Sequence, residues 1–233
     1  MGSIEYRSQR KIIKSLTMKS FIIHLSKVKT SLESALETKA GLENIGIVAE
    51  LFEGSYGPEI EKQFNEEGRE FHCVEGIKIN RKTAGTGAKG VFHSHYRLWQ
   101  ICVDLNEPIM VFEDDTILLR QFKPIDFDEV LILSINYDWD MSLIWKQFLE
   151  ETNSLNEAQD YTSPFMPGTS GYIIKPIAAK KLLEEYKNTF IISDVAMNST
   201  VIKMQIHPQL IGRSKTMDEK LSLVRLKTWE GQY

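Results

Sequence analysis

Short apolar runs alternate with helical stretches along most of the chain, and this alternation limits the folds that the chain can adopt. A continuous apolar run between turn residues is typical of a buried strand, whereas apolar residues at three- and four-residue spacing indicate a helix. Strands that alternate with helices predict an α/β domain in which helices cover both faces of a sheet.

These patterns give the order of the expected elements. Strands are predicted at residues 19–25, 47–54, 108–112, 130–135, 168–176 (entered through a glycine turn) and 204–212. Helices are predicted at residues 28–46, 57–68, 91–107, 176–187 and 193–203. The Gly-, Thr- and Lys-rich segment 79–90 is expected to be a loop, and residues 139–167 are expected to form a long loop or flap.

The composition suits one globular domain with a substantial core, because 42% of the 233 residues are hydrophobic and 26% are charged. The formal net charge is −4, so nothing global points to nucleic acid or to an anionic membrane. No apolar run reaches the length of a membrane span, and no secretory signal is visible. Cys73 and Cys102 form neither a CxxC motif nor a disulfide framework, which favours a cytoplasmic location.

The two ends of the chain differ from the part between them. Residues 1–17 are polar and basic, and we interpret them as a flexible extension. A basic arm that binds an anionic partner is the alternative. The folded domain is predicted to cover residues 18–212, and a C-terminal tail follows at residues 213–233.

Three consecutive acids, Glu113, Asp114 and Asp115, stand between apolar runs at residues 109–112 and 117–119. Like charges this close repel, and carboxylates beside an apolar core are costly unless something compensates them. A solvated turn is one explanation, and a bound cation is the other. Ligands of α/β sheets bind beyond the carboxyl ends of strands, where carboxylates suit Mg²⁺ or Mn²⁺. The acids therefore indicate a metal–phosphate site, but an aspartyl-phosphatase nucleophile is excluded because Glu113 occupies its position.

An ordered set of motifs around these acids resembles glycosyltransferase family 25, the group of bacterial lipooligosaccharide galactosyltransferases and collagen galactosyltransferases. The first block is GAKGVFHSHYRLWQ followed by VFEDD, and the second is GTSGYIIKPIAAKKLL followed by SDVAMN. The resemblance covers about residues 19–212. In the first block, the positions in register with the family are Gly87, Gly90, Ser94, His95 and Trp99.

The resemblance implies a GT-A-type fold, which is a Rossmann-like single domain with a mixed sheet that uses a sugar nucleotide and Mn²⁺ or Mg²⁺. It implies a metal site at Glu113, Asp115 and His207, with Asp115 as the most direct ligand. A surface histidine is the alternative for His207. The residues predicted to bind the donor or the cofactor are His24, Lys82, Lys89, His95, Asp114, Gly168 and Gly171. The two glycines match the family's glycine loop before the acceptor site.

Several of these positions also have a structural explanation. His24 stands where the family usually has Asn, so the chain departs from the pattern on the donor side. Lys82 and Lys89 either meet the diphosphate or are simply solvated. His95 either braces the site or is a hydrogen-bonded core residue. His93 lies two positions away and would point elsewhere on a helix, so it is predicted to be structural.

Direct displacement at a sugar needs a base, because the acceptor hydroxyl attacks only as its proton is removed. Asp194 is the predicted base. Its alternative role is that of a helix N-terminal acid favoured by the helix dipole. Asp138 and Asp140, which follow the strand predicted at residues 130–135, are the rival candidates.

The predicted function is metal-dependent transfer of a sugar from a UDP-sugar to an acceptor hydroxyl, with inversion by direct displacement, in a catalytic domain at residues 18–212. The expected acceptor is a glycan or a lipid-linked saccharide, and peripheral contact with a membrane stays open. One alternative acceptor is a hydroxylated base of phage DNA, which the acidic composition does not favour. The other alternative is a non-catalytic module that binds nucleotide sugars.

Overall fold

The computed structural model describes residues 18–68, 70–71, 86–118, 122, 124–135, 157–166 and 168–213. The strands in this part of the chain are β1 (Lys19–His24), β2 (Ala49–Glu53), β3 (Glu70–Phe71), β4 (Ile109–Glu113), β5 (Thr116–Leu118), β6 (Val130–Ile135), β7 (Gln159–Asp160), β8 (Gly171–Ile174), β9 (Thr189–Phe190) and β10 (Met204–Arg213). The helices are α1 (Lys29–Asn44), α2 (Gly57–Glu66), α3 (Thr86–Leu105), α5 (Pro176–Glu185) and α6 (Ser193–Ala196).

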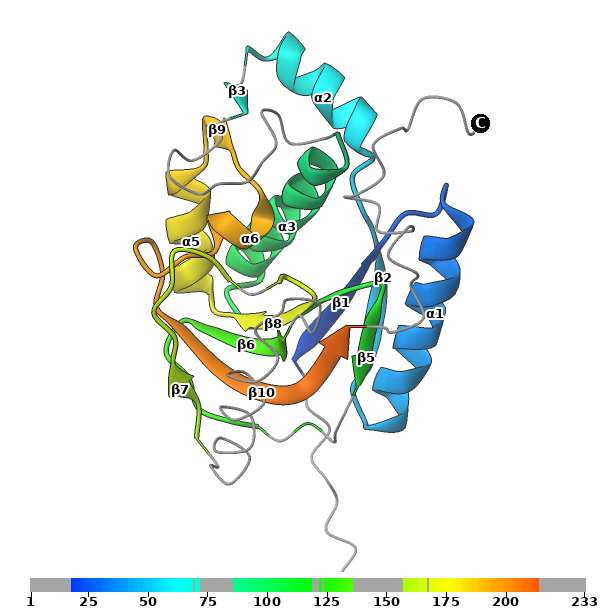
Figure 1. Ribbon diagram of the computed structural model, residues 1–233, viewed down its shortest axis with the longest axis vertical. Helices are drawn as coiled ribbons and strands as arrows, with labels where there is room; N and C mark the ends of the chain where they lie inside the picture. The colour runs from blue at the N-terminus through cyan, green and yellow to red at the C-terminus, as the bar shows by residue number, and fades with distance from the viewer. Residues whose placement is uncertain are drawn as a thin grey trace, which may run out of the picture.

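One mixed sheet organises these elements, and its strand order is β2-β1-β4-β8-β6-β10-β5, with β7 also paired to β10 (Figure 1). Strands β2, β1 and β4 are parallel neighbours, and β8 runs antiparallel between β4 and β6. Strands β3 and β9 form a separate two-stranded pair. The predicted α/β class with a mixed, Rossmann-like sheet is therefore confirmed.

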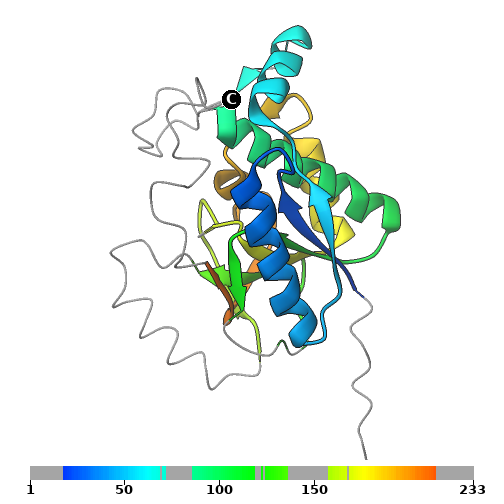
Figure 2. The same ribbon diagram turned by 90° about the vertical axis from the view of Figure 1, so that its right-hand side faces the viewer.

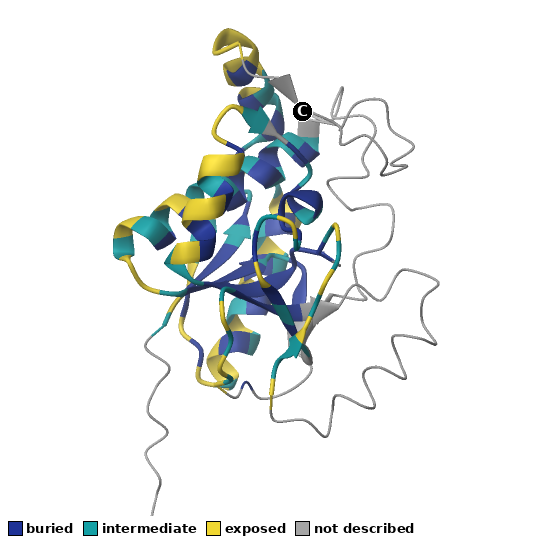
Figure 3. Cartoon of the chain, turned by 90° about the vertical axis from the view of Figure 1, so that its left-hand side faces the viewer, coloured by how far each residue is buried: buried dark blue, intermediate teal, exposed yellow. Residues whose placement is uncertain are grey.

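The core has two halves, because successive side chains of a strand point to opposite faces of the sheet. Phe21 and Val111 face the half that contains α2, α3, α5 and α6, and Ile22 and Met110 face the half covered by α1. Figure 2 shows α1 alone in front of the sheet, and Figure 3 shows the strands as a buried layer between helices whose outer sides are exposed. Helices thus cover both faces, as predicted.

Helix α3 begins earlier than the sequence predicted. Residues 79–90 were expected to be a loop, but α3 starts at Thr86 and includes Gly90. Glycine weakens a helix in isolation. Here tertiary packing compensates, because a Cβ at Gly90 would lie 2.4 Å from the carbonyl oxygen of Ser55. The glycine allows α3 to pack directly on the loop after β2.

Helix α6 is shorter than predicted. A helix was expected at residues 193–203, but α6 ends at Ala196. The side chain of Asn198 donates hydrogen bonds to the carbonyl groups of Val195 and Ala196, at 2.9 and 3.3 Å, which ends the helix. Ser193 is the first residue of the helix, and Ile192 precedes it without a side-chain cap.

Some predictions concern residues outside the described ranges. These are the extension at residues 1–17, residues 79–85 of the predicted loop, residues 139–156 of the predicted loop or flap, nearly all of the tail at 213–233, and the side chains of Lys82, Asp138 and Asp140. Within the described helices, none is long and apolar enough to cross a membrane.

Candidate active site

The parallel strands β2, β1 and β4 end at the same edge of the sheet, and polar side chains gather there. His24 at the end of β1 pairs with Glu53 at the end of β2, and Ile23 of β1 pairs with Glu113 at the end of β4. The sheet register therefore places Glu53, His24 and Glu113 side by side at this carboxyl edge. Open α/β sheets bind their ligands in this position.

The three acids do not share one environment. Asp114 turns toward α1, where its carboxylate accepts a hydrogen bond from the hydroxyl of Ser31. Burial raises the pKa of Asp114 to about 7. Thr38 of α1 also contacts this turn, with its hydroxyl 2.8 Å from the carbonyl oxygen of Asp114. Asp115 is buried, with 7% exposed, whereas the Glu113 side chain remains 27% exposed. Asp114 is thus hydrogen-bonded to α1, and its predicted role in binding the cofactor stays a prediction.

Glu113 and Asp194 come together at the hydroxyl of Thr169. The oxygen Oγ1 of Thr169 lies 2.6 Å from Oε1 of Glu113 and 3.1 Å from Oδ1 of Asp194. One hydroxyl has a single hydrogen, so it can donate fully to only one carboxylate at a time. Burial, together with the negative charge of Glu113, raises the pKa of Asp194 to about 6. The predicted metal ligand and the predicted base therefore belong to one cluster.

The loop before β8 makes this cluster possible. Gly168 has a φ of 104°, which is a left-handed conformation that favours glycine. Gly171 begins β8 and pairs with Phe112 of β4. The hydroxyl of Thr116 lies 2.6 Å from the carbonyl oxygen of Ser170, which ties this loop to the acidic turn. The two predicted glycines therefore border the segment that carries Thr169.

His95 lies behind Glu113 and is fully buried. Its Nε2 is 3.3 Å from Oε1 of Glu113, and its Nδ1 is 2.9 Å from the hydroxyl of Tyr172. Trp99, one turn further along α3, donates its indole N–H to the same hydroxyl at 3.1 Å. His95 is therefore a hydrogen-bonded core residue that also contacts the acidic cluster, and its predicted role in the site stays a prediction.

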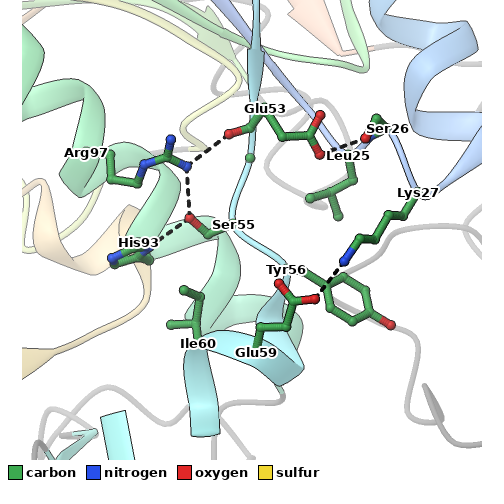
Figure 4. A pocket seen from close by; sticks show the side chains of 11 residues that line it. Leu25, Ser26, Lys27, Glu53, Ser55, Tyr56, Glu59, Ile60, His93 and Arg97 are labelled. Atoms are coloured by element: carbon green, nitrogen blue, oxygen red, sulfur yellow. Dashed lines mark hydrogen bonds and ion pairs between the residues drawn. The ribbon is translucent and has the colours of Figure 1, made fainter. Parts of the chain in front are cut away.

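A pocket of about 450 Å³ opens beside the ends of β1 and β2 (Figure 4). Arg97 of α3 donates to the carbonyl oxygen of Glu53 at 3.0 Å and lies over the ring of Phe52. At the rim, Lys27 forms an ion pair with Glu59 at 2.6 Å. The residues that line the pocket are Leu25, Ser26, Lys27, Glu53, Gly54, Ser55, Tyr56, Glu59, Ile60, His93 and Arg97.

Two residues of the first motif block, His93 and Ser94, form hydrogen bonds to Ser55 in the wall of this pocket. Ser94 accepts the backbone N–H of Ser55 at 2.8 Å and donates to the carbonyl oxygen of Gly90 at 2.7 Å. His93, which was predicted to be only structural, has Nδ1 2.7 Å from the hydroxyl of Ser55 and lines the pocket. The first helical block of the motif therefore shapes the pocket through α3 and the loop after β2.

Three further predicted residues that the structure describes have other positions and contacts. Lys89 forms an ion pair with Glu61 of α2 at 2.6 Å. His24 is buried, and its Nε2 lies 3.9 Å from Oε2 of Glu53. His207 lies in β10, where the pairing with β6 is irregular. Within the described ranges, no three side chains of the metal-ligating types are grouped to hold an ion. The metal set of Glu113, Asp115 and His207 therefore stays a prediction.

Sequence reasoning did not assign a role to Thr169, Tyr172 or Arg97. Thr169 lies between the two predicted glycines, and Tyr172 is the tyrosine of the second motif block. Their position inside motifs was the available signal. Arg97 lies on the same helix as His93, one turn further on, but nothing in its spacing indicates that it faces a pocket.

Comparison with known proteins agrees with this geometry. The family described as Glycosyltransferase family 25 (LPS biosynthesis protein) matches residues 17–197, which include every element from β1 to α6. The chain is also 34% identical over 130 residues to the lipooligosaccharide biosynthesis protein lex-1 of Haemophilus influenzae. That match covers 50% of the chain and 41% of the relative, so it spans less than half of the relative's length.

The fold, the acids at the carboxyl edge of its sheet and these matches place the protein in the class of glycosyltransferases. Within that class, the chain belongs to glycosyltransferase family 25. The resemblance that the two sequence blocks indicated is thereby confirmed.

Proposed function

We propose that the chain transfers a sugar from a UDP-sugar to an acceptor hydroxyl by direct displacement, within a fold of the GT-A type. The observation that carries this proposal is the meeting of Glu113 and Asp194 at the hydroxyl of Thr169. An acid at the end of a sheet strand and a second acid on another element are the two charged groups that such a reaction needs. A module that only binds a nucleotide sugar has no use for the second.

The pocket beside β1 and β2 is the proposed site for the nucleoside of the donor. The pocket lies at the carboxyl edge that also carries Glu113. In the sheet, β1 is the one strand between β2 and β4, so the pocket and Glu113 are close neighbours along this edge. Tyr56 offers an aromatic ring at its wall, and Arg97 brings a positive charge. A nucleoside bound there would direct its diphosphate along the ends of the strands toward Glu113.

The donor groups at the acidic turn fit a hard divalent cation. Glu113 and Asp115 offer carboxylate oxygens, which suit Mg²⁺ or Mn²⁺, and such ions usually complete their shell with water and substrate phosphates. Two protein carboxylates are therefore sufficient without a third protein ligand. When bound, the cation offsets the negative charge that grows on the leaving diphosphate.

Asp194 is the proposed base. As the acceptor oxygen forms its bond to the anomeric carbon, the carboxylate takes the hydroxyl proton. The bond between that carbon and the diphosphate oxygen breaks, and its electron pair leaves with UDP. A single base with no covalent intermediate inverts the anomeric centre. The raised pKa of Asp194 makes it a stronger base than an ordinary carboxylate.

The proposed acceptor is a saccharide. This follows from the relative, whose name assigns it to lipooligosaccharide biosynthesis. The cytoplasm stays the predicted location.

Calorimetry with UDP, in Mn²⁺ and in chelator, tests the donor part of the proposal. UDP should bind more tightly with Mn²⁺, and Asp115→Ala should remove that gain. Asp104→Ala is the matched control, because Asp104 is an exposed acid of α3. Equal UDP affinity in Mn²⁺ and in chelator would contradict the metal-dependent mechanism.

A further inference from the structure

A buried chain of hydrogen bonds leads from the core to Glu113. It contains the indole of Trp99, the phenol of Tyr172 and the imidazole of His95, and all three side chains are fully buried. The successive distances are 3.1 Å from Trp99 Nε1 to Tyr172 Oη, 2.9 Å from Oη to His95 Nδ1, and 3.3 Å from Nε2 to Glu113 Oε1.

The direction of this chain follows from its first member. An indole N–H can only donate, so the oxygen of Tyr172 accepts from Trp99. Burial raises the pKa of Tyr172 above its ordinary value, so the phenol keeps its hydrogen. Since Trp99 cannot accept that hydrogen, the acceptor is Nδ1 of His95. The neutral imidazole then carries its proton on Nε2, facing Glu113.

The opposite direction would be costly. If Nδ1 of His95 carried the proton, the oxygen of Tyr172 would accept from both His95 and Trp99. The phenolic hydrogen of Tyr172 would then lack the acceptor that Nδ1 supplies. A buried donor left without a partner is unfavourable, because its hydrogen bond to water is lost and not replaced. The buried arrangement therefore selects one tautomer of His95.

The fold builds the chain from three separate elements. Tyr172 lies in β8 opposite Val111 of β4, and both belong to the half of the core that contains α3. His95 and Trp99 lie four residues apart, on the same side of α3. The pairing of β4 with β8 and the packing of α3 thus bring the phenol between the two α3 side chains.

We propose that Tyr172 is a positioning residue, which holds His95 in the Nε2–H tautomer and thereby fixes the orientation of the Glu113 carboxylate. Oε1 of Glu113 then accepts from His95 on one side and from Thr169 on the other. Partners that orient a metal-binding group in this way are typical of metal sites. The importance of this orientation for catalysis rests on the proposed function, whereas the tautomer of His95 does not.

Nitrogen-15 NMR of the histidine rings tests the tautomer directly. The spectrum is recorded on the full chain at pH 8, and His95→Asn identifies the His95 signals. The expected result is a protonated Nε2 and an unprotonated Nδ1 in the unchanged protein. In Tyr172→Phe, this preference should weaken. A proton on Nδ1 in the unchanged protein would overturn the inference, and this outcome does not depend on the folding of Tyr172→Phe.

The second measurement is the gain in UDP affinity that Mn²⁺ produces. Tyr172→Phe should reduce this gain by about 10- to 100-fold, the usual effect of losing such a partner. Tyr186→Phe is the matched control, because the buried phenol of Tyr186 donates to the carbonyl oxygen of Ala196 and not to His95. An unchanged gain in Tyr172→Phe would overturn the inference.

A double-substitution cycle separates positioning from general damage to the core. If Tyr172 acts through His95, then Tyr172→Phe should cost little further affinity in a protein that already carries His95→Ala. Equal losses in both backgrounds would contradict that route. If Mn²⁺ has no effect on UDP binding in the unchanged protein, the proposed function fails, and the NMR result still decides the tautomer.

Discussion

The α-carbon of Gly90 packs against the carbonyl group of Ser55 so closely that a Cβ at position 90 would lie 2.4 Å from its oxygen. The start of α3 and the loop after β2 therefore meet backbone to backbone. That loop lines the pocket. The contact therefore contributes both to the stability of the fold and to the shape of the proposed donor site.

Gly90→Ala should lower both stability and UDP affinity. The new methyl group meets backbone atoms that cannot rotate away, and overpacking of this kind costs about 1–3 kcal/mol. Thermal unfolding and calorimetry with UDP measure the two effects. Gly68→Ala is the control: Gly68 has a φ of 66° with open space around it, so stability should fall while UDP affinity stays unchanged. A Gly90→Ala protein with normal stability would show that this contact is not tight.

Asp194→Asn should lower the rate of sugar transfer by roughly a hundred- to ten-thousand-fold, the contribution of general base catalysis. UDP affinity should barely change, because the loss arises in the transition state. Steady-state kinetics with a saccharide acceptor provides the measurement. If Asp194 is only an acid of the first turn of α6, the Asn protein will remain active. Loss of activity in Asp138→Asn or Asp140→Asn instead would move the base to the segment after β6.

The pH dependence of transfer should report the same carboxyl group. A base works only when deprotonated, and the pKa of Asp194 is raised to about 6. The rate should therefore fall as the pH falls through about 6, and be highest above it. The residual activity of Asp194→Asn should lack this acidic limb. A limb that persists in the Asn protein would assign the titration to another group.

Asp114 should make folding stability depend on pH in the opposite sense from a salt-bridged acid. Its pKa rises from 3.8 to about 7 on folding, so between these values the folded state binds a proton that the unfolded state does not. The contribution of Asp114 to the free energy of unfolding is therefore greatest below about pH 4, and it is lost as the pH rises through about 7. Asp114→Asn should stabilise the protein at pH 8 by on the order of 1 kcal/mol or more, about 2–4 °C in melting temperature. Equal melting temperatures at pH 8 would contradict a buried carboxylate.

Tyr56→Ala should weaken UDP binding by roughly tenfold, because an aromatic side chain that stacks on a base contributes about 1–3 kcal/mol. Ile177→Ala is the control, since Ile177 is an exposed apolar residue of α5 outside the pocket. Isothermal calorimetry compares the two proteins. Equal UDP affinity in the two proteins would contradict binding of the nucleoside in this pocket.

The sequence by itself determined the α/β class and most element positions, because hydrophobic periodicity is local and β4, β6 and α5 each carry a clear pattern. It also indicated Glu113 and Asp194 through their motifs. It could not predict the early start of α3, since helix propensity alone disfavours Gly87 and Gly90, and only packing on Ser55 compensates.

Only the tertiary structure decided which side chains meet. Asp114 and Ser31 are 83 residues apart in the chain, and Glu113 and Thr169 are 56 residues apart. Neighbouring acids point in different directions because alternate positions at a strand end face opposite sides of the sheet. For this reason Asp114 binds α1, whereas Glu113 reaches the hydroxyl that also contacts Asp194. Periodicity determines the face on which a residue lies, and strand pairing and helix packing determine its partner.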